Sequence, residues 1–176
     1  MDNDDYIVED ILVPKRKKKN SASKGKRRER ELAGILTKRF KKTFSRSIGS
    51  GNRWSQVGHL PKHAKDTLTG DLCCPEGFSF VIESKGGYDD IDLNSAFVDG
   101  HREVDEFLEQ VMDDSKRCDK KPIVLWKKNR KPWLAILKTN ELVGTISLNF
   151  EYKMDYRDWS IVALDDLLKL DDSFFF

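Results

Sequence analysis

Two stretches of the chain, residues 26–42 and 101–117, carry apolar side chains at the spacing of a helix that is buried along one side. The apolar stripes consist of Leu32, Ile35, Leu36 and Phe40 in the first stretch and of Val104, Phe107, Leu108 and Val111 in the second. We expect a helix at each place. Ser23 is a candidate cap for the first helix, because a serine oxygen can accept a hydrogen bond from the free amides of a first turn.

Shorter apolar runs predict strands between and after these helices. The runs cover residues 43–47, 72–74, 78–85, 122–126 and 133–137. The second and third runs flank a Pro-Glu-Gly turn, so we expect them to pair as a hairpin. Past residue 140 the pattern is weaker, with a candidate strand at 142–150 and a candidate helix near 164–170. The order α-β-β-β-α-β-β predicts an α/β domain of the α+β kind, with a mixed central β-sheet flanked by helices.

The alternation of side chains in the run 78–85 predicts where its polar residues point. Glu83 and Lys85 lie on one face, opposite to the face of the phenylalanines. The turn before this run places Asp71 opposite residues 81–83. We therefore expect Asp71, Glu83 and Lys85 to converge on one face of a two-stranded unit.

Two glutamates near the start of the first helix point in different directions. Glu29 lies about 45° from the centre of the apolar stripe, and Glu31 lies well over 100° from it. We expect Glu29 to follow the edge of the packed face and Glu31 to point toward solvent. A carboxylate that faces a core is costly unless it is paired, so a cation or a lysine is expected beside Glu29.

Three carboxylates and a lysine are the groups needed to hold a hard divalent cation and to aim a water at a phosphodiester bond. The group consists of Glu29, Asp71, Glu83 and Lys85. Carboxylate oxygens suit Mg²⁺, and Mn²⁺ is expected to substitute for it. Metal-dependent DNA cleavage is the leading interpretation. An ion-pair network without a metal is the alternative.

The formal net charge of +2 hides a strong asymmetry. Residues 15–30 contain ten Lys or Arg and one acid, whereas residues 164–176 contain four Asp and one Lys. A basic segment that leads into the first helix predicts contacts with DNA phosphates, with Arg27 and Arg28 among the candidates. Residues 1–23 are expected to be a disordered basic arm, and a solvated arm or an import signal explains the same composition.

Two further segments have more than one interpretation. Residues 52–69 are a long polar loop in which Arg53 is a candidate DNA contact, and Trp54 could stack on an unpaired base or anchor the loop. The acidic and aromatic tail 171–176 could dock into a protein partner or mimic DNA, or its phenylalanines could fold onto the core.

The size and the cysteines are typical of a cytoplasmic protein. A chain of 176 residues fits one domain with tails. No apolar run approaches the roughly 20 residues of a membrane span. The acidic first residues do not resemble a secretory signal. Cys73, Cys74 and Cys118 are odd in number and include an adjacent pair, which favours a reducing cytoplasm.

Four short motifs together are similar to those of a known enzyme family. The motifs are Lys24-Gly25-x-x-x-Glu29-Arg30-Glu31-Leu32, Arg46-Ser47-x-Gly49-Ser50, Gly70-Asp71 and Ile82-Glu83-x-Lys85. In this order they resemble the archaeal-type Holliday-junction resolvases of the PD-(D/E)XK nuclease superfamily. The resemblance covers roughly residues 24–138. Thr69-Gly70 stands where a proline often precedes the aspartate.

The resemblance implies a restriction-endonuclease-like core in residues 24–140, followed by an extension over 141–176. It implies metal ligation by Glu29, Asp71 and Glu83, with Lys85 beside the attacking water. It also implies a homodimer and DNA contacts, for which the candidates are Lys24, Arg46, Ser47 and Ser50.

The expected function is that of a metal-dependent, structure-selective DNA endonuclease, with a Holliday-junction resolvase as the leading case and branched DNA as the partner. Two alternatives stay open. One is a restriction, repair or replication-linked nuclease for duplex, nicked or flap DNA, and the other is a non-catalytic nucleic-acid-binding module. The compact size is compatible with a virus-encoded protein that acts in the host cytoplasm.

Overall fold

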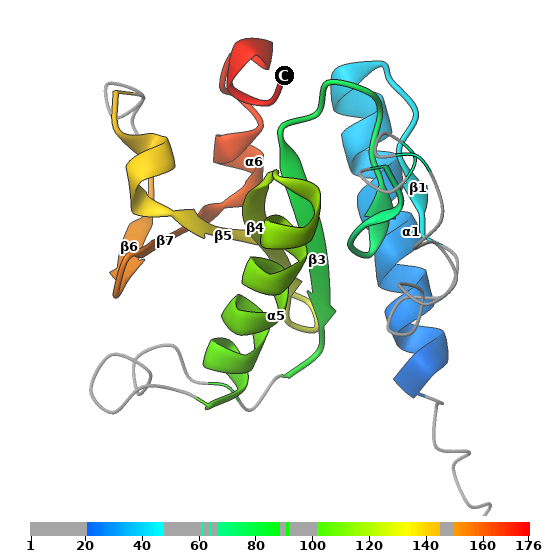
Figure 1. Ribbon diagram of the computed structural model, residues 1–176. Helices are drawn as coiled ribbons and strands as arrows, with labels where there is room; N and C mark the ends of the chain where they lie inside the picture. Colours follow the sequence, from blue (N-terminus) through cyan, green and yellow to red (C-terminus); the bar gives the residue numbers. More distant parts are fainter. Residues whose placement is uncertain are drawn as a thin grey trace, which may run out of the picture.

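A computed structural model describes residues 21–47, 61, 64, 67–88, 91, 102–144 and 150–176 of the chain. Its main feature is a five-stranded mixed sheet with helices on both faces (Figure 1). A separate two-stranded sheet lies beside the first helix. The predicted fold class, a mixed sheet flanked by helices, is therefore confirmed.

The strand order of the large sheet is β3-β4-β5-β7-β6. The strands are β3 (Phe80–Gly86), β4 (Lys121–Lys127), β5 (Leu134–Lys138), β7 (Trp159–Ala163) and β6 (Lys153–Tyr156). The pair β3 and β4 is parallel, and helix α5 (Arg102–Cys118) makes the crossover between them. All other neighbours in the sheet are antiparallel. The strand β3 is thus an edge strand of the sheet, and side chains from other elements can pack beside its free edge.

Alternating side chains divide the sheet into two packed faces. On one face, Val81 and Val124 pack with the apolar stripe of α5, as the sequence predicted for residues 101–117. On the other face, Phe80 and Ile82 pack with helix α1 (Ser21–Phe40) and with residues near the C-terminus. The position of β3 between α1 and α5 determines where the candidate active site lies (Figure 1).

The helix α1 begins earlier than the sequence indicated. It runs from Ser21 to Phe40 rather than over 26–42, so Ser23 lies within the helix and the expected cap at that residue is wrong. The stripe that contains Leu32 and Leu36 is buried, as predicted. The basic segment from residue 24 onward is therefore helical, which places its cations on a rigid element.

The expected hairpin between residues 72–74 and 78–85 is wrong in its pairing. The strand β2 (Leu72–Cys73) pairs antiparallel with β1 (Ser45–Arg46), with Arg46 opposite Leu72. The strand β3 pairs with β4 instead. A bond from the Asp71 amide to the Ile82 carbonyl nevertheless sets Asp71 opposite residues 81–83, as predicted.

The C-terminal part of the chain extends the large sheet, so residue 140 does not mark a break in the fold. The sequence predicted a strand over 142–150, but Leu142 is the last residue of the 3-10 helix η1 (Thr139–Leu142). Residues 145–149 of the predicted strand lie outside the described residues. The strands β6 and β7, which the sequence did not predict, extend the sheet. They are followed by the short helix α6 (Leu164–Leu167) and the 3-10 helix η2 (Asp172–Phe174).

The aromatic tail folds onto this core. Phe175 is 2% exposed, and Phe174 and Phe176 pack against the same cluster. Of the interpretations that the sequence left open, the structure therefore supports the one in which the phenylalanines are part of the core. Among the described residues, we find no helix with the length and apolar character that crossing a bilayer requires.

Candidate active site

Asp71 reaches the sheet through a conformation that only its glycine neighbour allows. Gly70 has a φ of +82°, and a Cβ atom at this position would lie 2.6 Å from the Ile82 carbonyl oxygen. The Asp71 amide then donates to that oxygen at 2.9 Å, and the Ser84 amide donates to Asp71 Oδ2 at 2.9 Å. Proline, whose φ lies near −65°, could not replace Gly70 here. The backbone before Asp71 therefore has a conformation that the proline often found at this place could not adopt.

Glu83 and Lys85 lie on the α5 face of β3, two residues apart. Glu83 is 3% exposed. Lys85 Nζ lies 2.7 Å from Glu83 Oε1, in an ion pair in which both side chains are largely buried. The carboxylate of Asp71 is close enough to raise the pKa of Glu83 electrostatically. The predicted convergence of Asp71, Glu83 and Lys85 is therefore confirmed as geometry.

Glu29 joins this region from α1 and is paired with an arginine. Its residue is 9% exposed, and its Oε2 atom accepts a short bond from Arg46 Nε. The sequence predicted that Glu29 would follow the edge of the packed face beside a cation or a lysine. Its burial is confirmed, and its partner is an arginine. The charge of Glu29 also raises the pKa of Asp71, which places the two carboxylates in one electrostatic environment.

The helix α5 supplies a side of the site that the sequence analysis missed. Lys85 Nζ donates to Gln110 Oε1 at 2.7 Å and lies 5.0 Å from the centre of the Phe107 ring. Asp114, one turn further on, influences the pKa values of both Asp71 and Glu83. Asp114 follows Val111 by three residues and so continues the apolar stripe of α5. A carboxylate at a position where the helical period expects an apolar residue is the sequence signal that could have identified Asp114.

Burial makes both central carboxylic acids weak. Desolvation raises the pKa of Glu83 to about 8, and the nearby Asp71 adds to this, against the lowering effect of Lys85. Desolvation likewise raises the pKa of Asp71 to about 6, although the Ser84 amide opposes it. Two buried carboxyl groups side by side cannot both ionise cheaply. The pair therefore holds protons at a pH at which ordinary carboxylates have lost them.

This proton binding predicts the pH dependence of stability in a chelator. Between about pH 5 and 8 the folded chain holds more protons on Asp71 and Glu83 than the unfolded chain, whose groups titrate near 3.8 and 4.5. The free energy of unfolding should then fall as the pH rises through this window. Urea denaturation in EDTA at several pH values would measure it. The slope should become shallower in Glu83→Gln, and equal slopes in the two proteins would contradict the assignment.

The residues fit a divalent cation, and two of the three carboxylates that the resemblance implied as ligands, Asp71 and Glu83, lie together. Among the described side chains, no group of three acids, cysteines or histidines is placed to hold one ion together. Glu29 is instead paired with Arg46. Mg²⁺ commonly binds through one or two carboxylates plus substrate phosphate. Asp71 and Glu83 meet that requirement, because a cation between them would relieve their repulsion.

The expected DNA contacts have different outcomes. Lys24 and Arg27 are exposed on α1. Ser47 is 1% exposed, so the expectation that its side chain contacts DNA does not fit this conformation. Arg46 is 20% exposed and is used by Glu29. Ser50, Arg53 and Trp54 lie outside the described residues.

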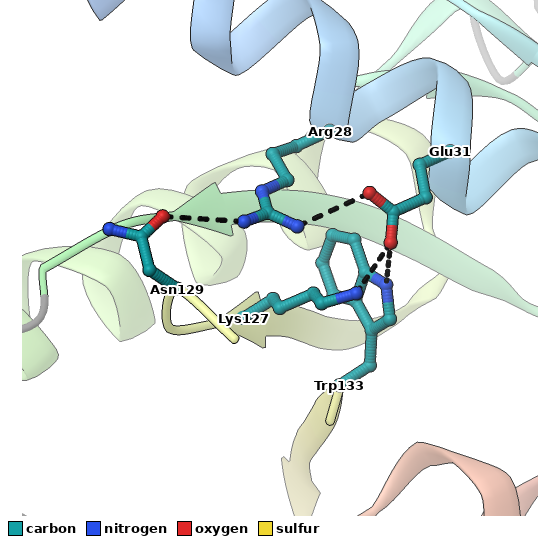
Figure 2. Close-up of polar contacts among 5 residues, drawn as sticks. All are labelled: Arg28, Glu31, Lys127, Asn129 and Trp133. Atoms are coloured by element: carbon teal, nitrogen blue, oxygen red, sulfur yellow. Dashed lines mark hydrogen bonds and ion pairs between the residues drawn. The ribbon is translucent and has the colours of Figure 1, made fainter. Parts of the chain in front are cut away.

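Glu31 does not point to solvent, and this corrects the sequence-based expectation (Figure 2). Its Oε1 atom accepts bonds from Lys127 Nζ at 2.5 Å and from Trp133 Nε1 at 3.2 Å. Its Oε2 atom accepts from Arg28 Nη1 at 3.2 Å. Although partial burial opposes it, the bonds from Lys127 and Trp133 lower the pKa of Glu31. Arg28, a predicted DNA contact, is therefore occupied within the protein and is only 16% exposed.

Comparisons with known proteins identify a family that this chain matches over most of its length. A family model described as phage putative PDDEXK endonuclease matches residues 20–174. A 1.6 Å structure of Hjc, a Holliday junction resolvase from the archaeal hyperthermophile Archaeoglobus fulgidus, aligns with a TM-score of 0.40 and 15% sequence identity. That alignment covers 85% of this chain and 99% of the other. No protein with a curated description matches the sequence significantly.

Proposed function

Because the chain belongs to the phage putative PDDEXK endonuclease family, we propose that it is a divalent-metal-dependent endodeoxyribonuclease that cuts branched DNA. One observation carries the catalytic part of this proposal. Asp71, Glu83 and Lys85 converge, largely buried, at the end strand of the sheet. Two buried carboxyl groups without a cation cost stability. A module that only binds nucleic acid gains nothing that offsets this cost, so the arrangement favours an enzyme.

Asp71 and Glu83 would hold the cation, for which Mg²⁺ is proposed and Mn²⁺ as a substitute. When bound, such an ion makes water more acidic and offsets negative charge on the phosphate. The hydrogen bond from the Ser84 amide orients the Asp71 carboxylate. Glu83 is held in place by Lys85. The site is therefore preorganised before DNA arrives, which is how fixed charges contribute to catalysis.

Lys85 would act beside the reacting phosphate. Its ammonium group lies between two oxygen atoms, Glu83 Oε1 and Gln110 Oε1, each 2.7 Å away. Held there, it can orient the attacking water by hydrogen bonding and add positive charge where negative charge develops. Glu29 and Arg46 form a neighbouring ion pair that we propose to contribute to DNA or metal binding once the substrate is present.

The choice of branched DNA rests on the sequence motifs. Their order resembles that of archaeal-type Holliday-junction resolvases, so a four-way junction is the first substrate to test. Two symmetric cuts in a junction require two active sites, and we therefore propose a homodimer. The phage family and the three free cysteines support a virus-encoded enzyme that works in the reducing cytoplasm of its host.

The test compares a labelled four-way junction with linear, nicked and flap DNA of matched length, in Mg²⁺ and in EDTA. Paired symmetric nicks in the junction alone would support the resolvase. Cleavage of flap or duplex DNA would support the metal site but not the resolvase, and the proposed substrate would then be DNA of the kind cut in repair, replication or restriction. Binding without cleavage in Mg²⁺ and Mn²⁺ would overturn the proposal of an enzyme.

The contact between Gln110 and Lys85 gives a separate prediction. Gln110→Met keeps the side-chain length but removes the oxygen that accepts from Lys85. We expect the single-turnover cleavage rate to fall by roughly 10- to 100-fold, because the ammonium group is no longer held for the reaction. The dissociation constant for DNA should stay the same. Quenched-flow assays at saturating enzyme would measure the rate.

The neighbouring Glu109, which is exposed on the same helix, supplies the control. Glu109→Met should leave the cleavage rate close to that of the wild type, and Gln110→Glu should restore part of it by returning an oxygen acceptor. An equal loss in Glu109→Met and Gln110→Met would show that the helix surface, rather than the contact to Lys85, is responsible.

A further inference from the structure

The turn between β4 and β5 is basic and is fastened to the first part of α1. Its residues 127–131 read Lys-Lys-Asn-Arg-Lys. Glu31 of α1 joins it through bonds to Lys127 at its start and to Trp133 just after it (Figure 2). A single carboxylate thus connects two segments that are about a hundred residues apart in the sequence.

Arg28 makes the second connection between the same elements. Its Nη2 atom donates to Asn129 Oδ1 at 3.4 Å, while its Nη1 atom donates to Glu31 (Figure 2). The stem of Arg28 passes against the end of β3, where a Cβ atom on Gly86 would lie 2.8 Å from Arg28 Cγ. The Gly87 amide donates to the Lys127 carbonyl at 3.0 Å. The start of α1, the end of β3 and the turn are therefore held as one unit.

These links use some of the cations and leave others facing solvent. Arg28 and Lys127 are 16% and 18% exposed and point into the joint around Glu31. The exposed cations of the two segments are Lys24, Lys26, Arg27 and Arg30 on α1 and Arg130 and Lys131 on the turn. Lys24 Nζ lies 3.6 Å from the position that a Cβ atom would take on Gly87, which places it at the end of β3.

We propose that the exposed cations of α1 and of the β4–β5 turn form one surface that binds the DNA backbone, and that Glu31 is the joint that aligns its two halves. This proposal rests on the proposed nuclease function. Lys85 directly precedes Gly86, so a strand that follows this surface passes the active-site end of β3. Phosphate contacts position DNA without reading its sequence, which suits an enzyme that selects DNA by shape.

The first test removes the two exposed cations of the turn. Arg130→Gln/Lys131→Gln is titrated by fluorescence anisotropy with a labelled four-way junction, in EDTA and over a series of NaCl concentrations. Each lost phosphate contact lowers the slope of log K against log salt by about 0.9. We expect the slope to fall by roughly 2 and the dissociation constant near 0.1 M salt to rise by about 50-fold.

The control removes the same charge from two exposed lysines outside the proposed surface. Lys116 lies near the end of α5 and Lys169 follows α6, and their side chains are 70% and 73% exposed. Lys116→Gln/Lys169→Gln should retain the wild-type slope. Equal losses in both double variants, an unchanged slope in Arg130→Gln/Lys131→Gln, or wild-type binding without salt dependence would overturn the proposed surface.

The second test concerns the joint. Glu31→Ala removes a negative charge, so by charge alone it should tighten binding to DNA. If Glu31 aligns the two halves, binding should instead weaken, at a temperature at which circular dichroism shows the variant to be folded. Tighter binding would overturn the role of Glu31. Because all binding is measured in EDTA, failure of wild-type protein to cleave any DNA in Mg²⁺ would refute the nuclease separately.

Discussion

Glu83→Gln is expected to abolish metal-dependent DNA cleavage and to leave the folded protein at least as stable as the wild type. Glutamine has the shape of the protonated acid, which burial and the nearby Asp71 already favour at neutral pH. It cannot supply the negative charge that would hold a divalent cation. Loss of several kcal/mol of electrostatic stabilisation lowers the cleavage rate by roughly a thousand-fold or more.

Three measurements make this expectation specific. The cleavage rate is determined under single turnover in Mg²⁺ and Mn²⁺, cation affinity by calorimetry, and stability by urea denaturation in EDTA. Asp71→Asn should behave alike, because the amide oxygen can still accept from the Ser84 amide. Glu76→Gln, at an exposed carboxylate in the turn before β3, should cleave normally. Full Mg²⁺-dependent cleavage by Asp71→Asn would refute the site assignment.

Phe175→Ala is expected to have the largest effect on stability. The ring of Phe175 is 2% exposed, and its centre lies 4.8 Å from that of Phe40 and 4.9 Å from that of Phe174. The Ser79 amide also donates to the Phe175 carbonyl at 2.7 Å, next to the start of β3. Removing a buried phenylalanine costs about 3–5 kcal/mol, which corresponds to a fall of roughly 10 °C in Tm for a chain of this length.

Tyr152→Ala is the matched control, because it removes another aromatic ring, one that is 74% exposed. Its Tm should change by no more than a degree or two, since surface substitutions usually change stability by less than about 0.5 kcal/mol. Differential scanning calorimetry of both variants would measure the difference. A Tm for Phe175→Ala close to that of the wild type would mean that the tail leaves the core in solution. The tail would then again be a candidate for binding a partner.

The importance of the tail for the active site follows from where it packs. Phe175 and Phe78 stack with their planes 9° apart, and Phe78 belongs to the connection that joins β2 to β3. Arg39 of α1 donates hydrogen bonds to the carbonyls of Leu168 and Leu170, in the segment just before the tail. The end of the chain therefore packs between α1 and β3, the strand that carries Glu83, and stabilises their relative position.

Local rules were sufficient for the centre of the candidate site. Glu83 and Lys85 share a face of β3 because strand side chains alternate with a period of two. Asp71 lies opposite Ile82 because only a short connection separates them. The position of Glu29 at the edge of the packed face followed from the helical period of 3.6. Each of these relations involves residues that are close in the sequence or one regular element.

The remaining features depend on which elements meet, and helical or strand periodicity does not encode this. The same helical rule gave the wrong environment for Glu31, because its angle on α1 says nothing about the arrival of Lys127 and Trp133 from distant strands. Gln110 became a partner of Lys85 only when α5 packed across β3.

Among the elements that the structure delimits, the sequence by itself therefore determined the order α1-β1-β2-β3-α5-β4-β5, the apolar faces of the helices and the convergence of Asp71, Glu83 and Lys85. Tertiary structure decided that β2 pairs with β1, that α5 completes the site and that Phe175 belongs to the core. The physical reason is that periodic patterns report whether a side chain is buried. The partner that buries it is selected by long-range packing, through the shape and charge of surfaces that form only when the chain folds.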